Sequence, residues 1–274
     1  MTTVTAFWLG LVQGLTEFFP VSSSGHLVLL QHFFGIREPQ LAFDVIVHLG
    51  TAVAVIAFTW RELGEILASL VKLPRWLIGG KLAQAWSQER GLRLLGLLVL
   101  GSIPAGLAGI FLQDQFRALF GAPIVVSVLL LVTGLILLGA DKAQQGDKQL
   151  AEVRAGDSFL VGLAQAGAIL PGISRSGSTI AAGLKLGLSR EAAAKFSFLL
   201  SLPAIGGAAL LELGDLGQSA ISRGSLAVGF VTSALAGYFA IRYLVALLQR
   251  GKLRGFAYYC FAVGLASFVA IALL

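Results

Sequence analysis

Apolar residues fall in long uninterrupted runs, and these runs set the expected elements of the chain. A transmembrane helix needs about 20 consecutive apolar residues, and six runs are close to that length or longer. Runs of this kind also exclude a membrane β-barrel, whose strands alternate apolar and polar positions. The chain is therefore expected to be an all-α polytopic membrane protein. Its six predicted spans cover residues 41–60, 92–112, 122–140, 192–213, 225–248 and 255–274.

Two further apolar stretches are interrupted by proline, glycine and serine. Residues 4–19 make about 24 Å of helix, too little to cross a hydrocarbon core of about 30 Å. The stretch breaks at residues 20–25 and resumes at residues 26–34, and the same arrangement returns at residues 159–170 and 178–187. Each pair is predicted to form a re-entrant helical hairpin. Lipid tolerates such a break only where protein buries the backbone or a wet cavity receives it.

The two halves of the chain repeat each other at an offset of 152 positions. Residues 10–14 resemble residues 162–166, and residues 22–25 match residues 174–177. One membrane domain is therefore expected to contain two repeats, at about residues 1–140 and 156–274. Each repeat holds one re-entrant hairpin and three crossings. Because three is odd, the second repeat enters the membrane upside down, and the repeat is predicted to be inverted.

The distribution of basic residues predicts the orientation. Twelve lysines and arginines lie in the connections 61–93, 141–157 and 249–254, whereas the other side carries Arg37, Arg117 and Arg223. By the positive-inside rule, the first set faces the cytoplasm and both termini face outward. The two hairpins then dip from opposite sides, and their tips are expected to meet near the midplane. Two of the connections have expected structures of their own. Residues 61–90 are expected to form a helical surface segment that rests on headgroups, and the connection that contains Asp114 is expected to be a short loop.

Composition supports a membrane protein and excludes other classes. Charged residues make up only 12% of the 274 residues and hydrophobic residues 57%, whereas about 25% charged residues is usual in soluble domains. The net charge of +6 follows the membrane, so no nucleic-acid partner is expected. A single cysteine, Cys260, excludes a disulfide framework. No basic residue precedes Arg37, so the N-terminus is expected to be retained rather than cleaved as a signal peptide.

Polar side chains gather at the two predicted hairpin tips. Gln13 and Glu17 are four positions apart and share one helix face, and a carboxylate at membrane depth is costly and usually functional. Arg175 has the planar fork that suits phosphate oxygens, and a helix expected to begin near Ser178 aims free N–H groups at a ligand. The full set is Gln13, Glu17, Ser22, Ser23, Ser24 and His26 from the first tip, and Ser174, Arg175, Ser176, Ser178 and Thr179 from the second.

Hydrolysis of a phosphate or pyrophosphate bond uses this set of groups. Arg175, the hydroxyls and the loop N–H groups hold phosphate oxygens and stabilise charge in the transition state. His26 or a serine acts as nucleophile or base. Glu17 with Gln13 either binds a divalent cation or orients His26; Mg²⁺ is favoured, with Ca²⁺ as the alternative. An apolar slot at this depth suits a lipid tail.

The sequence gives less reason to place the other two histidines, His32 and His48, in the site. His32 is expected at a loop or interface. His48 lies in the first span with Asp44 one turn earlier, so either a supporting role at the site or simple packing is compatible with the sequence.

Two stretches resemble the motifs of a known family. Gln13-Gly-Leu-Thr-Glu17-Phe-Phe-Pro-Val-Ser-Ser-Ser-Gly-His26 and Pro171-Gly-Ile-Ser-Arg-Ser-Gly-Ser-Thr179 are similar to the (E/Q)xxxE and PGxSRSxxT boxes of the bacterial undecaprenyl pyrophosphate phosphatases associated with bacitracin resistance. The motifs agree in order and spacing, and the resemblance covers essentially the whole chain.

The resemblance implies a hydrolase of the bacterial inner membrane. Its substrate is undecaprenyl diphosphate, its product recycles the carrier of peptidoglycan synthesis, and its site opens to the periplasmic or outer side with a divalent metal. Carried over, Gln13 and Glu17 become metal or general-base positions, His26 a catalytic imidazole and Ser23 a nucleophile. The phosphate-binding residues are then Ser174, Arg175, Ser176 and Thr179, together with Ser24. Gln13 stands where some members have glutamate, which weakens a two-carboxylate metal site. A homodimer is compatible with the sequence.

A transporter is the competing interpretation. Inverted repeats with broken hairpins are also the architecture of secondary transporters, so a lipid-phosphate flippase or anion carrier would use the same phosphate site. A carrier needs no nucleophile and no base. Glu17 with His26 on one hairpin and Arg175 on the other therefore favour the enzyme.

Overall fold

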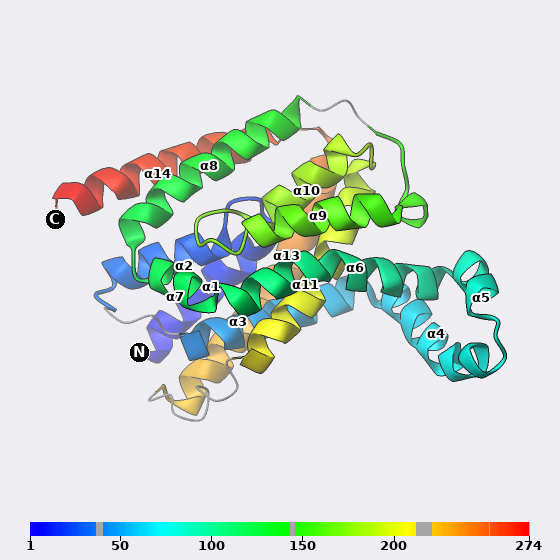
Figure 1. Ribbon diagram of the computed structural model, residues 1–274. Helices are drawn as coiled ribbons and strands as arrows, with labels where there is room; N and C mark the ends of the chain where they lie inside the picture. The colour runs from blue at the N-terminus through cyan, green and yellow to red at the C-terminus, as the bar shows by residue number, and fades with distance from the viewer. Residues whose placement is uncertain (37–40, 143–145, 212–220, 252, 274) are drawn as a thin grey trace.

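The protein is helical, as its apolar runs predict (Figure 1). The structure is a computed structural model that describes residues 1–36, 41–142, 146–211, 221–251 and 253–273. The predicted ends at residues 213 and 274, and the basic residues Arg37 and Lys252, lie outside this part of the chain.

In the part of the chain that the structure describes, five helices are long and apolar enough to cross a membrane, and a sixth crossing is possible if one bent pair counts as a span. The bent pair is α3 (Leu41–Phe58) with α4 (Trp60–Ile78), which meet at 85°. Every predicted span thus falls on a helix. The five long helices are α6 (Arg90–Phe111), α8 (Pro123–Asp141), α11 (Arg190–Leu211), α13 (Arg223–Gln249) and α14 (Arg254–Leu273).

Both predicted broken hairpins are present. The first consists of α1 (Thr3–Phe18) and α2 (Ser23–Phe33), and the second of α9 (Ala155–Gly167) and α10 (Arg175–Lys185). Within each pair, the chain leaves the helix for a few residues and then starts a new one. The breaks fall at the two proline-containing and serine-containing stretches.

The second helix of each hairpin begins a turn earlier than expected. The Ser22 hydroxyl accepts from the N–H of Gly25, and the Ser174 hydroxyl accepts from the N–H of Gly177. Serine at such a capping position satisfies a free N–H group and fixes where the helix starts. The predicted start near Ser178 was therefore wrong, because Ser174 caps α10 and puts Arg175 in its first turn.

The ends of these two helices also match across the repeat. Gly35 follows α2 with φ of 72°, and Gly187 follows α10 with φ of 84°. A left-handed glycine just past the last turn is a common way to end a helix. Caps at positions 22 and 174 and glycines at 35 and 187 thus recur at the same offset of 152, so the sequence repeat is also a repeat of local structure.

The connections lie at the ends of the bundle. Both termini lie at one end, whereas α4 and α5 (Leu82–Gln88) extend from the other (Figure 1). A 3-10 turn, η1 (Leu150–Glu152), precedes α9. The short loop expected around Asp114 is instead a helix, α7 (Gln113–Phe120). Its phenylalanines are four positions apart and share one face, which gives the segment a reason to be helical.

Close packing holds the first hairpin in the bundle. Helix α1 packs on α13, which also packs on α3, while α14 lies along α8 (Figure 1). At Gly10 a Cβ atom would lie 2.6 Å from the carbonyl oxygen of Gly229 on α13. Small residues at such contacts let helix backbones approach closely, as is usual between membrane helices.

Candidate active site

The tips of the two hairpins meet, as the repeat predicts. The Ser22 hydroxyl accepts from the N–H of Gly172 at 3.2 Å and donates to the carbonyl of Ile173 at 3.4 Å. In return, the Ser176 hydroxyl donates to the carbonyl of Phe19 at 3.1 Å. Residues about 150 positions apart in the sequence therefore form one junction.

Unusual backbone conformations and one helix anchor this junction. Ser22 adopts φ of 67°, a left-handed conformation uncommon in residues other than glycine. Hydrogen bonds of its hydroxyl to the backbone of Gly25, Gly172 and Ile173 hold it there. Gly172 has φ of 103°. Thr133 on α8 donates to the carbonyl of Gly172 at 2.8 Å and accepts from the N–H of Ser174 at 2.9 Å. The second loop is thus fixed to α8.

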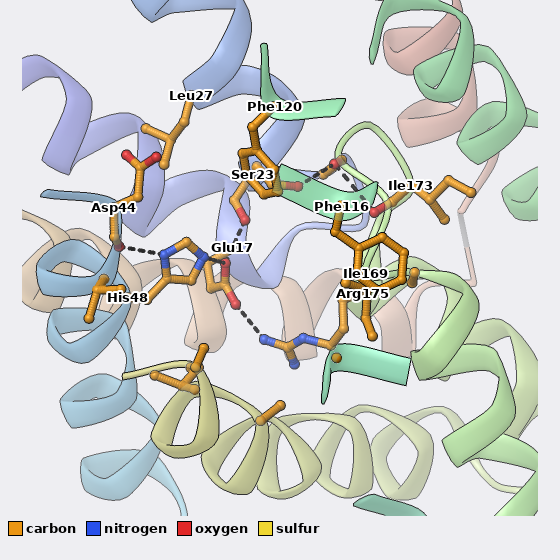
Figure 2. Close-up of a pocket in the computed structure, with 18 of the residues that line it drawn as sticks. Glu17, Ser23, Leu27, Asp44, His48, Phe116, Phe120, Ile169, Ile173 and Arg175 are labelled. Atoms are coloured by element: carbon orange, nitrogen blue, oxygen red, sulfur yellow. Dashed lines mark hydrogen bonds and ion pairs between the residues drawn. The ribbon is translucent and has the colours of Figure 1, made fainter. Parts of the chain in front are cut away.

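Glu17 is the centre of the polar cluster at this junction (Figure 2). Its Oε1 pairs with the Arg175 guanidinium. Its Oε2 accepts from the Ser23 hydroxyl at 2.5 Å and from Gln13 Nε2 at 3.0 Å, and lies 3.5 Å from His48 Nε2. The carboxylate is buried, with 6% of the residue exposed. The predicted meeting of a guanidinium from one hairpin with an acid from the other is confirmed.

Arg175 is also held by a hydrogen bond to α11. Its Nη1 donates to the carbonyl of Ser197 at 3.3 Å. The Ser197 hydroxyl lies 2.6 Å from Thr179 Oγ1, which donates to the carbonyl of Arg175 at 2.8 Å. Thr179 does not line the pocket described next. The structure therefore places Thr179 where it supports Arg175 rather than where it would touch a phosphate.

The cluster lies in the wall of a pocket of about 310 Å³. Much of the remaining wall is apolar, and it includes Phe116 and Phe120 on α7 and Ile205 on α11. The polar lining residues are Glu17, Ser22, Ser23, Ser24, Asp44, His48, Gln113, Ser174, Arg175 and Ser176. Seven candidate residues from the two tips are thus brought to one cavity: Glu17, Ser22, Ser23, Ser24, Ser174, Arg175 and Ser176. Gln13 lies behind it, in contact with Glu17.

His26 lies elsewhere. Its Nδ1 is 2.8 Å from the carbonyl oxygen of Ser22, and its Nε2 is 2.9 Å from the hydroxyl of Tyr259 on α14, with the two rings stacked at 5.6 Å. These contacts turn the imidazole toward α14, where it lines a different, largely apolar cavity of about 1020 Å³. The expectation that His26 would stand beside Glu17 and Arg175 is therefore not met, and its catalytic role stays a prediction.

The cluster fits a cation held by Gln13 and Glu17 poorly. Both oxygens of Glu17 already have partners, and Gln13 faces Glu17 with its N–H group while its Oε1 is buried without a partner. Among the described residues, no three His, Cys, Asp or Glu side chains are arranged to hold a metal ion. The protein side chains alone therefore do not form a resident divalent-cation site in this arrangement.

Three residues outside the predicted set complete the site. His48 faces Glu17 from α3, and this position favours the supporting role that the sequence left open beside simple packing. Asp44 accepts from Gln31 Nε2 at 2.8 Å and lines the pocket. Asp44 and His48 are four positions apart, and this spacing on one helix face could have indicated from the sequence that they act together. No feature of the sequence identified Thr133, because a single threonine in an apolar span cannot be distinguished from other packed residues.

The site is suited to an anion. The first turns of α2 and α10 both border the pocket, through Ser23 and Ser24 and through Arg175 and Ser176. A helix start carries about half a positive charge and unpaired N–H groups, which bind phosphates. Arg175 adds a full charge and two parallel donors. Two helix starts and one guanidinium thus face a cavity whose remaining wall is mostly apolar, apart from polar side chains such as Glu17, paired with Arg175, and Asp44, paired with Gln31.

Comparison with known proteins agrees with this chemistry. The model of the family described as bacitracin resistance protein BacA matches residues 6–266. A protein of Halothermothrix orenii named undecaprenyl-diphosphatase is 43% identical over 268 residues, which cover 97% of this chain and 96% of that protein. One of Methanobrevibacter smithii with the same name is 41% identical over 271 residues, 98% of each chain. The chain belongs to the BacA bacitracin resistance family.

Proposed function

We propose that this protein hydrolyses undecaprenyl diphosphate to undecaprenyl phosphate and inorganic phosphate. The observation that carries the proposal is the convergence of Glu17, Ser23 and Arg175 from three helices on one pocket. The family and the shared name of its relatives support the same substrate. Recycling of this lipid carrier serves cell-wall synthesis and fits the family's connection with bacitracin resistance.

The terminal phosphate is bound at the polar end of the pocket. Arg175 and the N–H groups at the starts of α2 and α10 hold its oxygens, helped by the hydroxyls of Ser24, Ser174 and Ser176. Substrate therefore competes with Glu17 for Arg175. Phe116 and Phe120 provide an apolar wall for the lipid. A volume of about 310 Å³ is at the lower end of small-ligand sites, so the pocket encloses only the first part of a C55 chain and the remainder lies in the bilayer.

Ser23 is the nucleophile in this proposal. Its hydroxyl already donates to Glu17 at 2.5 Å, which is the arrangement of a nucleophile with its base. The Ser23 oxygen bonds to the terminal phosphorus, the bond from that phosphorus to the bridging oxygen breaks, and undecaprenyl phosphate leaves. Glu17 takes the hydroxyl proton, and Arg175 stabilises the charge on the phosphoryl oxygens. Water then hydrolyses the phosphoserine.

Any divalent cation enters with the substrate. A diphosphate presents several oxygens to Mg²⁺ or Ca²⁺, and Mg²⁺ usually completes its shell with substrate phosphates and water rather than with a cage of protein ligands. Glu17 would be the protein group to face such an ion, and Gln13 supports Glu17 through its N–H group. Such an ion would neutralise charge on the phosphates.

The finer topology is also part of the proposal. Two inverted repeats, with six crossings, sit in the bacterial cytoplasmic membrane, and both termini and the pocket opening face outward. The recurrence at offset 152 and the basic connections opposite the termini support this arrangement. Single cysteines test it in cells: Thr2→Cys should react with a membrane-impermeant maleimide and Gln84→Cys should not. The opposite labelling would reject the orientation.

Phosphate release by the pure protein tests the function. The protein in detergent micelles is expected to release inorganic phosphate from undecaprenyl diphosphate and from farnesyl diphosphate. Micelles have no two sides, so a flippase or anion carrier would release none. Absence of phosphate release over a range of Mg²⁺ and Ca²⁺ concentrations would reject the hydrolase.

A further inference from the structure

Helix α4 leaves the bundle nearly at a right angle to the helix before it. It meets α3 at 85°, at the end of the bundle opposite the termini (Figure 1). The 18 residues of α3 make about 27 Å of helix, close to the thickness of a hydrocarbon core of about 30 Å. Because α3 is long enough to cross with little help from α4, α4 is free to lie along the membrane surface.

One side of α4 packs on the start of a predicted span. Ile66 and Ser69 are buried, with 6% and 2% of each residue exposed. At Gly91, the second residue of α6, a Cβ atom would overlap the carbonyl oxygen of Glu65 and lie 2.7 Å from Ser69 Oγ. This close contact holds α4 at the level of the first turn of α6, which is the end of that span.

A second side of α4 is apolar and exposed. Leu67, Val71, Pro74 and Ile78 recur every three or four positions, so they share one face of the helix. Leu67, Val71 and Ile78 are 62%, 83% and 89% exposed. These four residues form an apolar row that no described part of the chain covers. An exposed apolar surface of this kind marks a contact with lipid or with another protein.

The remaining sides of α4 face water. Arg61, Lys72 and Arg75 are exposed, and they follow the apolar row around the helix. Glu62 and Glu65 come next, in the wall of a polar pocket of about 420 Å³ between α4, α5, α6 and α11. Around its circumference the helix thus meets the bundle, the apolar row, the cations and a polar cavity, in this order. A helix that lies in the membrane interface has this arrangement.

We propose that α4 is an in-plane membrane helix that binds anionic phospholipids. The apolar row enters the acyl-chain region of the bilayer, and the cations beside it contact the lipid phosphates. The expected surface segment thereby acquires a defined lipid-facing side and a preference for negatively charged headgroups. The inference is independent of the hydrolysis proposed above, and it holds for either leaflet.

The charge of the segment explains why the lipid is anionic. Residues 61–93 contain a surplus of three positive charges, because six residues are basic and three are acidic. Glu62 pairs with Lys195 on α11 at 3.2 Å, so it does not offset the cations of its own segment. The basic residues are Arg61, Lys72, Arg75, Lys81, Arg90 and Arg93, and the acidic ones are Glu62, Glu65 and Glu89.

Two tryptophans mark the same level of the membrane. The Arg61 guanidinium lies 5.4 Å from the centre of the Trp60 ring, and Lys72 Nζ lies 5.9 Å from that of Trp76. Tryptophan is enriched at the interface between membrane and water, where its ring sits among the headgroups. A cation held over such a ring is therefore at the level of the lipid phosphates.

Fluorescence quenching in nanodiscs tests the proposal. A bimane label is attached to Leu67→Cys in a Cys260→Ala background, and the full-length protein is reconstituted in phosphatidylcholine with a minority of phosphatidylglycerol. Lipids brominated in their acyl chains should quench this label, whereas aqueous iodide should not. Brominated phosphatidylglycerol should quench about fivefold more than its share of the bilayer predicts, the factor that one nearby cation supplies. The triple variant Arg61→Gln/Lys72→Gln/Arg75→Gln should lose this preference.

Glu65→Cys is the matched control, because it lies two positions from Leu67 and on the side of α4 that lines the polar pocket. Its label should be quenched by iodide and not by brominated lipid. Ile78→Cys replaces Leu67→Cys if that variant aggregates. Quenching of the label on the apolar row by iodide alone, or by neither agent, would overturn the proposal, since the row would then face water or protein. Quenching in proportion to the share of each lipid would also overturn it, by showing no preference for negative charge.

Discussion

Glu17 on α1 and Arg175 on α10 form an ion pair between groups 158 positions apart in the sequence. The pair is buried at the junction of two hairpins, and it joins the base of the proposed reaction to the group that binds phosphate. In the proposed reaction, substrate takes over the guanidinium, and Glu17 is then left beside Ser23. Without substrate, each member of the pair offsets the buried charge of the other.

Removing the guanidinium should stop the reaction. We expect Arg175→Ala to lower kcat/KM by on the order of 10³-fold or more, the range seen for arginines that stabilise phosphoryl transfer. The variant should also be less stable, because Glu17 is left buried without its partner. Arg223→Ala, at an exposed position at the start of α13, is the control and should keep full activity. Full activity of folded Arg175→Ala would remove this residue from the mechanism.

Replacing the adjacent serines Ser23 and Ser24 should lower activity to very different extents. Ser23→Ala removes the proposed nucleophile and should lower kcat by on the order of 10³-fold or more, because loss of a nucleophile disables the covalent route. Ser24→Ala removes one phosphate hydrogen bond and should cost about 10- to 100-fold. Rapid quenching of the wild-type protein with labelled substrate should trap phosphate on Ser23. Equal activities of the two variants and no phosphoserine would point to direct attack by water.

His26 should act through the loop that it holds. Its Nδ1 contacts the Ser22 carbonyl next to the proposed nucleophile. An asparagine amide can reproduce that donor, so His26→Asn should keep much more activity than His26→Ala. If His26 transfers protons, as the sequence alone suggested, both variants should be equally inactive. Tyr259→Phe, which removes the partner of Nε2, should lower the melting temperature more than the rate.

Metal ions should affect turnover but not the stability of the empty protein. A ligand that binds the folded state raises the melting temperature, yet both Glu17 oxygens are already engaged. We therefore expect Mg²⁺ to stimulate phosphate release, EDTA to reduce it, and neither to shift the melting temperature without substrate. A rise in melting temperature with Mg²⁺ alone, lost in Glu17→Gln, would demonstrate a resident ion.

The apolar wall should recognise the first isoprene units. Burial of a phenylalanine side chain contributes about 1.5–3 kcal/mol, so Phe116→Ala should raise KM by about 10- to 100-fold. The rise should be equal for farnesyl and undecaprenyl diphosphates, because the pocket encloses only the part that both share. Phe111→Ala, exposed at the end of α6, is the control. An effect confined to the C55 substrate would show that the pocket reaches further along the chain.

Much of the fold could be predicted because lipid restricts the choices. A helix satisfies all of its backbone groups within one segment, so long apolar runs become spans in hydrocarbon, and short broken runs become hairpins where serine and proline interrupt them. The chemistry of Glu17 and Arg175 could be predicted for the same reason, since charges at that depth have few other uses. These features are local in the sequence, or repeat at a fixed offset.

Tertiary structure decided which side chains share a cavity. Ser23 and His26 are three residues apart, yet Ser23 contacts Glu17 while His26 contacts Tyr259, 233 positions away. The two partners come from α1 and α14, which lie far apart in the sequence, and no periodicity encodes their position around α2. Likewise α3 brings His48 to Glu17, and α8 brings Thr133 to the second loop. The sequence determined the helices, their breaks and the type of chemistry, whereas the packing of distant helices determined which residues can carry it out.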